Sequence, residues 1–212
     1  MNNVTKMFLN LIIVGAFSGA VLAWVFHLAD PLIQANREKE LKESIFKVLP
    51  EAKDYRKAEK GLAGENIVVY LGLDEDKKPV GVAFKADGGG FQGNVGVMVG
   101  LDLEYQSLKG VEILDQLETP GLGDRIRETE FKEQFKGVEV RPRLEYIKYR
   151  KPEKPNQIQA ITGATISSKA VVTNINKAVE KVLAAFPQGE ISTIPAEAAA
   201  PEASPHETGG DR

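Results

Sequence analysis

The pattern of apolar and polar residues begins with one long apolar run. Phe8 to Ala29 reads FLNLIIVGAFSGAVLAWVFHLA and contains no charged residue. A stretch of about 20 apolar residues is enough for one helix to cross a bilayer. The pattern therefore predicts a transmembrane helix over residues 8–29, after a short segment at 1–7. The alternative is a cleaved signal peptide, but the run is long for one and only Lys6 supplies its basic start.

Apolar residues return at helical spacing directly after the predicted span. Leu41, Ile45, Val48 and Leu49 recur among charged residues. This spacing predicts an amphipathic helix that continues out of the membrane and packs on the main domain. Residues 30–58 are assigned to this helix and a connector.

The middle of the chain alternates between β-rich runs and turn residues. These runs predict strands at Ile67–Leu73, Val80–Lys85, Val95–Asp102, Gly110–Leu114 and Val138–Tyr146. Between the last two, Phe131 and Phe135 lie four residues apart, as in a short core-facing helix over Glu128–Phe135. We therefore expect an α+β domain over residues 59–186, with a mostly antiparallel sheet and packed helices.

The last part of the chain has a different composition. Residues 187–212 consist largely of Ala, Glu, Pro, Ser and Gly without periodic apolar positions, which predicts a disordered tail. The tail holds five acids and one base, so residues 1–186 carry a net charge of +1 although the whole chain carries −3. Because the folded part is nearly neutral and has no basic stretch interleaved with aromatic residues, a nucleic-acid partner is not expected.

The chain has no cysteine, and its two histidines are His27 in the apolar run and His206 in the tail. Thiolate zinc sites, iron–sulfur clusters, disulfides and thiol nucleophiles are thereby excluded. The predicted domain also lacks a base–nucleophile pair, so we expect no metal site and no autonomous catalytic residue. Any redox chemistry must come from a cofactor held in another way.

Two glycine-containing segments depart from ordinary core patterning. Residues 87–93 place four glycines in the six positions after Asp87, which fits either a close approach of the backbone to a ligand or a tight hairpin loop. Residues 117–123 read LETPGLG, in which Pro120 stiffens the chain and two glycines leave the backbone amides accessible. A ligand-binding loop and a plain strand-to-helix connection both remain open for this second segment.

A third segment runs from Gln159 to Ser168 into apolar residues at helical spacing. Small and hydroxyl residues at a helix start leave free amides and the positive end of the helix dipole, which together suit a phosphate. The hydroxyls of such a run can also cap the helix without binding anything. From the residues alone, a phosphate site and a simple helix cap are about equally supported.

Two of these segments resemble known motifs of the FMN-binding domain family. Thr162-Gly163-Ala164-Thr165 followed by Ile-Ser-Ser looks like its flavinylation motif, and Glu118 to Gly123 resembles a second hallmark near the flavin ring. The order of both motifs, behind one span and in a short chain, is similar to the G subunits of Rnf-type electron transport complexes. The resemblance covers roughly residues 5–185. It differs at Gln159, where the family carries an acid.

The resemblance implies a covalent FMN, joined through its phosphate to Thr165 by a flavin transferase. The other cofactor-binding residues expected from the two motifs are Thr162, Gly163, Ala164, Ser167, Ser168, Glu118, Thr119, Gly121, Leu122 and Gly123. It further implies an electron relay between ferredoxin and NAD that is coupled to sodium or proton movement. Membrane lipid and the other subunits of an Rnf-type membrane complex are the implied partners.

The expected location is the cytoplasmic (inner) membrane, with the flavin domain on the outer, periplasmic face, although the basic residues flanking the span do not settle its orientation. Two other functions stay open. One is the related C subunit of a sodium-translocating NADH:quinone reductase. The other is an anchored binding or scaffold module without flavin, in which Thr165 only caps a helix.

Overall fold

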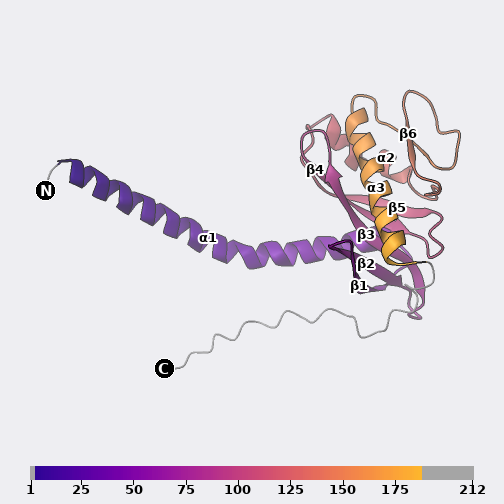
Figure 1. The fold of residues 1–212 in the computed structure, drawn as a ribbon, viewed down its shortest axis with the longest axis horizontal. Helices are drawn as coiled ribbons and strands as arrows, with labels where there is room; N and C mark the ends of the chain where they lie inside the picture. The colour runs from indigo at the N-terminus through magenta and orange to yellow at the C-terminus, as the bar shows by residue number, and fades with distance from the viewer. Residues whose placement is uncertain (1–2, 188–212) are drawn as a thin grey trace. The chain divides into compact units, whose positions relative to one another are not determined.

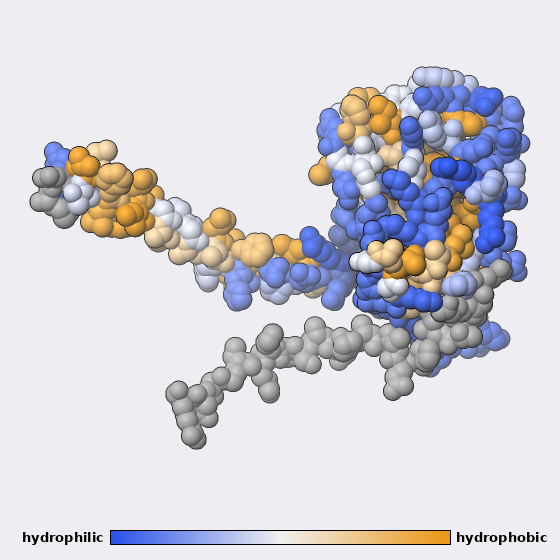
Figure 2. All heavy atoms as spheres, viewed as in Figure 1, coloured by the Kyte–Doolittle hydropathy of each residue, from blue (hydrophilic) through white to orange (hydrophobic). Residues whose placement is uncertain are grey.

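The computed structural model describes residues 3–187, and the predicted tail at 187–212 lies almost entirely outside that range. Helix α1 (Asn3–Val48) contains Pro31. Internal contacts divide the chain into two units, residues 1–42 and 43–212, so the last turn of α1 belongs to the second unit. The first part of α1 is hydrophobic on its surface (Figure 2). Among the described residues, α1 is the one helix long and apolar enough to span a membrane.

The second unit is built on a five-stranded antiparallel sheet whose strands follow the order of the sequence (Figure 1). The strands are β1 (Asp54–Leu62), β2 (Glu65–Leu73), β3 (Pro79–Gly89), β4 (Asn94–Leu101) and β5 (Leu108–Gln116). Next come the 3-10 helix η1 (Gly123–Arg127), α2 (Thr129–Glu133), the parallel pair β6 (Glu145–Ile147) and β7 (Gln157–Gln159), and α3 (Thr165–Ala185). The predicted α+β class with a mostly antiparallel sheet is confirmed.

One face of the sheet packs against α3. Val171, Ile175 and Val179 of α3 are buried in one core with Phe84 of β3 and Val97 of β4. These helix positions recur every four residues and side chains on one face of a strand recur every two, so each element turns its apolar side to the other. This packing places the first turn of α3 beside the loops at one end of the sheet.

The opposite face of the sheet carries a row of glycines that receives the end of α1. A Cβ built on Gly100 would lie 2.3 Å from the carbonyl oxygen of Val48, and one on Gly81 would lie 2.8 Å from Leu49 Cδ2. Val48 and Leu49 are completely buried. The absence of side chains on the sheet therefore makes room for the last residues of α1, whereas Leu41 of the predicted amphipathic face is only partly buried.

Replacing Gly100 by alanine should destabilise the domain, because the added methyl overlaps a backbone atom that cannot rotate away. We expect a loss of about 1–3 kcal/mol in unfolding free energy, as for other overpacked cores. Chemical denaturation of the full chain measures it. Gly61→Ala is the matched control, since a Cβ there meets nothing within 4 Å; an equal loss in both variants would contradict the close packing at Gly100.

Glu112 of β5 connects the end of α1 to α2 on this face. Its carboxylate accepts hydrogen bonds from Lys132 Nζ at 2.7 Å and from Lys47 Nζ at 3.2 Å. Burial alone would raise the pKa of Glu112, but the two lysines outweigh it and lower the pKa below its ordinary value of 4.5. A lowered pKa in the folded state means that ionised Glu112 stabilises the fold.

Glu112→Gln should therefore lower the unfolding free energy by about 1 kcal/mol at neutral pH. This stabilisation is present above the unfolded pKa of about 4.5 and is lost as the pH falls through the lowered folded pKa. Denaturation curves at pH 7 and in acid measure both. The exposed ion pair of Glu133 with Lys136 supplies the control Glu133→Gln, which should change little; a Glu112→Gln effect that persists in acid would contradict the assignment.

Two segments differ from the predicted strands. The strand predicted over Val138–Tyr146 is wrong: Glu139 forms an isolated bridge with Ser107, and regular pairing starts only at β6. Val138 and Val140 bond the backbone of Leu108 and Gln106, whereas at Leu144 the side-chain amide of Asn176 bonds both the N–H and the C=O at 2.9 Å. The apolar pattern does not predict strand β1, because its sequence DYRKAEKGL is rich in charged residues. Charged residues are common in an edge strand, and β1 lies at the edge of the sheet.

Candidate functional site

The three segments singled out in the sequence meet at the side chain of Glu118. This carboxylate is only 5% exposed. Its Oε1 accepts a hydrogen bond from the backbone N–H of Phe91 at 2.6 Å, and its Oε2 accepts one from the Ser167 hydroxyl at 2.8 Å. Glu118 thus joins the glycine loop after β3, its own loop after β5, and the first turn of α3.

Glycines surround this carboxylate because no side chain would fit. A Cβ on Gly90 would lie 2.1 Å from Glu118 Oε1, and a Cβ on Gly123 would lie 2.6 Å from Oε2. Gly121 and Gly163 instead have φ of +74° and +86°, a backbone conformation that favours glycine. Each of the three segments therefore has at least one glycine with a steric or conformational role at this junction.

The first turn of α3 has no capping side chain. The N-cap is Ala164, and no side chain bonds the first amides of the helix within the described residues. Ser168 instead donates to the carbonyl of Ala164 at 2.9 Å and accepts from the N–H of Ile161 at 3.1 Å. The simple-cap interpretation of the hydroxyl run therefore has no support in the geometry, and the helix start stays available to an anion.

Thr165 is the first residue of α3 and is partly exposed, while Thr162 three residues earlier is exposed. Ala164 between them is buried. The Thr165 hydroxyl therefore lies at the uncapped end of the helix dipole, within reach of a molecule from solvent. Ser167 and Ser168, predicted as cofactor residues, are buried and are bonded to Glu118 and to the backbone, so they fix the shape of the site.

Four large apolar side chains from the three segments remain in contact with solvent. We call them the apolar rim: Phe91, Leu117, Leu122 and Ile166, which are between 52% and 71% exposed. Leu122 Cδ2 lies 3.9 Å from the position of a Cβ on Gly163, which brings the second and third segments into contact. Exposed apolar groups gathered in this way are typical of a surface that binds a flat ligand or a partner.

Asp124 offers a further polar group that the sequence did not single out. It follows Gly123 in η1, and its Oδ1 is shielded from solvent yet accepts no hydrogen bond from the described part of the chain. A buried acceptor of this kind normally has a partner. A ligand that carries ring N–H or hydroxyl donors would supply one. The uncapped helix start, the glycine backbone, the apolar rim and this acceptor together fit a phosphorylated, planar cofactor.

Gln159 lies in β7 next to a second, polar pocket. The side-chain amide of Gln134 bonds its N–H at 2.9 Å and its C=O at 3.4 Å, so the backbone of β7 is held from the side. A pocket of 220 Å³ opens there, between Arg125, Gln134, Gln159 and Thr162. It lies beside Thr162, and Thr165 does not line it.

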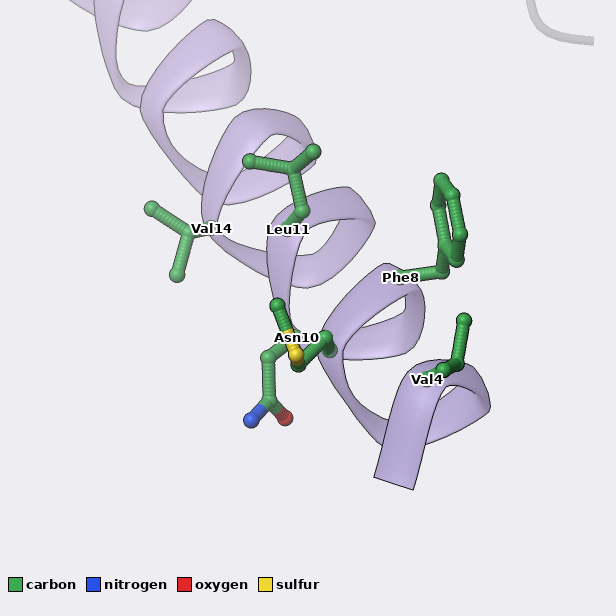
Figure 3. Close-up of a pocket in the computed structure, with 6 residues that line it drawn as sticks. Val4, Phe8, Asn10, Leu11 and Val14 are labelled. Carbon is green, nitrogen blue, oxygen red and sulfur yellow. The ribbon is translucent and has the colours of Figure 1, made fainter. Parts of the chain in front are cut away.

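A large apolar hollow elsewhere is a different kind of feature. It is lined by Val4, Met7, Phe8, Asn10, Leu11 and Val14, all from α1 (Figure 3). A hollow formed by one helix in its membrane-spanning stretch is a surface for lipid or for another helix.

Comparison with known proteins agrees with this geometry. The family described as FMN-binding domain matches residues 90–180, which include Glu118 and Thr165. The G subunit of the Na(+)-translocating ferredoxin:NAD(+) oxidoreductase complex of Acetobacterium woodii is 30% identical over 191 residues, which cover 84% of this chain and 90% of that protein. The chain belongs to the family of G subunits of ion-translocating oxidoreductase complexes.

Other members of the G-subunit family match over a similar length. The G subunit of the ion-translocating oxidoreductase complex of Methanosarcina acetivorans is 29% identical over 185 residues, with 85% of this chain and 95% of that protein covered. The crystal structure of the C subunit of Na(+)-translocating NADH-quinone reductase from Parabacteroides distasonis superimposes with a TM-score of 0.51 at 19% identity, and covers 68% of this chain and 79% of that one. The likeness to this C subunit concerns the fold alone.

Membership of the G-subunit family explains why the chain carries a long apolar helix. The relatives are subunits of ion-translocating complexes, and α1 supplies one span of suitable length and hydropathy. The chain is therefore a single-pass membrane protein within an oxidoreductase complex, with an FMN-binding domain beyond the span.

Proposed function

We propose that this protein holds FMN in phosphoester linkage to Thr165 and relays electrons in a complex that couples ferredoxin:NAD electron transfer to ion translocation. The observation that carries the proposal is the uncapped start of α3 at Thr165, enclosed by loops that meet at Glu118 within the FMN-binding match. Bound FMN supplies the one- and two-electron redox chemistry that the chain's own side chains lack.

The residues of the site would each contribute to holding that group. The amides and dipole of the first turn of α3 stabilise the negative phosphate. Gly163, where the nearest atom to a built Cβ is 3.9 Å away, would let the backbone approach the ligand, and the apolar rim would help to exclude water from it. Asp124 would offer its unpaired Oδ1 as an acceptor for one of the ligand's donors.

A link through the phosphate leaves the flavin ring chemically unchanged. It also retains a cofactor whose charge changes in every turnover. A flavin transferase would form the bond: the Thr165 oxygen would attack the phosphorus of an activated FMN donor, the donor's leaving group would depart from phosphorus, and the hydroxyl would lose its proton. We further propose, on the family resemblance and the absence of cysteine, that the domain faces the outer, periplasmic side of the inner membrane.

The experiment that tests this function is a denaturing gel of the purified full chain, viewed for flavin fluorescence and followed by intact-mass measurement. Fluorescence that migrates with the denatured chain, and a mass increased by one FMN residue, are expected. A dark band with the unmodified mass would favour an anchored module without covalent flavin. The alternative role in a quinone reductase shares the fold, and the identity of the proteins that copurify separates the two complexes.

A further inference from the structure

A strongly basic exposed segment lies outside the residues assigned to the cofactor site. Residues 143–154 hold five cations and two acids, and we call them the basic segment. All five cations are exposed: Arg143, Lys148, Arg150, Lys151 and Lys154. None of the five forms an ion pair with another residue in the range that the structure covers, whereas several lysines elsewhere in the domain have an acidic neighbour within 4 Å.

Tyr149 stands in the middle of these cations. Its side chain is 80% exposed, and its φ of +57° is uncommon for a residue with a side chain. An aromatic ring held out among arginines and lysines exposes apolar surface that a partner could cover. Tyrosine and arginine together are the residues enriched where proteins contact one another.

The basic segment is tied to the end of the domain where α3 begins (Figure 1). Lys169, one helical turn after Thr165, places its Nζ 6.0 Å from the ring centroid of Tyr146 in β6. Asn176 of α3 holds Leu144 through two hydrogen bonds of 2.9 Å. A protein bound to the basic segment would therefore lie beside the first half of α3, the half that begins at Thr165.

We propose that the basic segment is the docking surface for an acidic face of a neighbouring redox protein. Opposite charges orient such a partner and accelerate its encounter, and small, polar interfaces are typical of electron-transfer pairs. Calling the partner a redox protein rests on the proposed function, but the docking itself does not. Anionic lipid would also attract the cations, yet the position beside α3 and the arginine–tyrosine composition favour a protein.

The test places a photo-activated cross-linking residue at position 149 of the full chain in its native membranes. We expect an adduct with another protein, mapped by mass spectrometry to a peptide rich in Asp and Glu. Raising the salt from about 0.05 M to about 0.5 M should lower its yield several-fold, because the attraction is screened. Lys148→Glu combined with Lys151→Glu should lower the yield roughly tenfold.

Lys53→Glu combined with Lys77→Glu is the matched control, since both residues are exposed, lie outside the basic segment and change the charge equally. This pair should leave the yield within about twofold of the parent. An adduct with lipid, an adduct with residues 188–212 of the same chain, equal losses in both pairs, or no adduct would overturn the proposal. Gel fluorescence of every sample measures the flavin separately. If the adduct forms but the flavin is absent, the result contradicts the proposed function and leaves the docking proposal standing.

Discussion

Thr165→Val is expected to remove the covalent flavin completely while leaving the fold intact. Valine keeps the β-branched shape of threonine but has no hydroxyl to form a phosphoester. Because Thr165 is partly exposed and caps nothing in the described chain, its hydroxyl contributes little to stability. Flavin fluorescence on a denaturing gel and the intact mass measure the modification, and thermal unfolding checks the fold.

Two control variants separate the hydroxyl of Thr165 from its neighbours. Thr165→Ser keeps a hydroxyl at the same position and should still be modified. Thr162→Ala removes the other threonine of the motif, which lies outside α3, and should also be modified. Flavin that persists in the Thr165→Val chain would show that another residue carries it.

Glu118→Ala is expected to have the largest effect on stability and to lower flavin content as well. The change removes an acceptor that two donors share, the N–H of Phe91 and the hydroxyl of Ser167. Hydrogen bonds to a charged group contribute about 1.5–3 kcal/mol each, so we expect the loss of both to lower the unfolding free energy by about 3–6 kcal/mol. Urea denaturation measures the stability, and gel fluorescence measures the flavin.

Glu128→Ala is the matched control for Glu118. Glu128 lies nearby in sequence, but its ion pair with Arg125 is exposed and should contribute less than about 1 kcal/mol. Limited proteolysis should show new cleavage in residues 87–93 for Glu118→Ala alone. If both variants lost similar stability, or if the glycine loop stayed protected, Glu118 would not be the residue that joins the three segments.

The strands of the sheet differ in how far the sequence predicts them. β2 to β5 are predictable because apolar runs stand between clear turns. In β4 every residue after Asn94 is buried. The helix α3 covers one face of the strand, and Val48 at the end of α1 covers the other face at Gly100. Burial on both faces explains why the apolar run is nearly continuous and does not alternate with polar residues. β1 gives no such signal because an edge strand needs no apolar pattern. Val138–Tyr146 misleads because its backbone partners are divided between the segment before β5, the turn before β7 and the side chain of Asn176.

The site can be predicted in its parts but not in its assembly. Glycines and hydroxyls mark each of the three segments, and the motif resemblance selects Thr165. Nothing local in the sequence indicates that Glu118 would bond Phe91, which lies 27 residues earlier, and Ser167, which lies 49 residues later. The sequence gives no signal for Asp124 either, because the burial of its Oδ1 without a hydrogen-bond partner depends on the folded structure. Contacts over such separations depend on how the loops meet at the end of the sheet.

The most direct test of the central claim is peptide mapping of the full chain isolated from its native membranes. Proteolysis followed by tandem mass spectrometry assigns a modification to a single residue. The proposed function predicts a peptide spanning residues 159–169 that carries one FMN, with fragment ions that place it on Thr165. An unmodified peptide, or FMN located on Thr162 or a serine of α3, would contradict it.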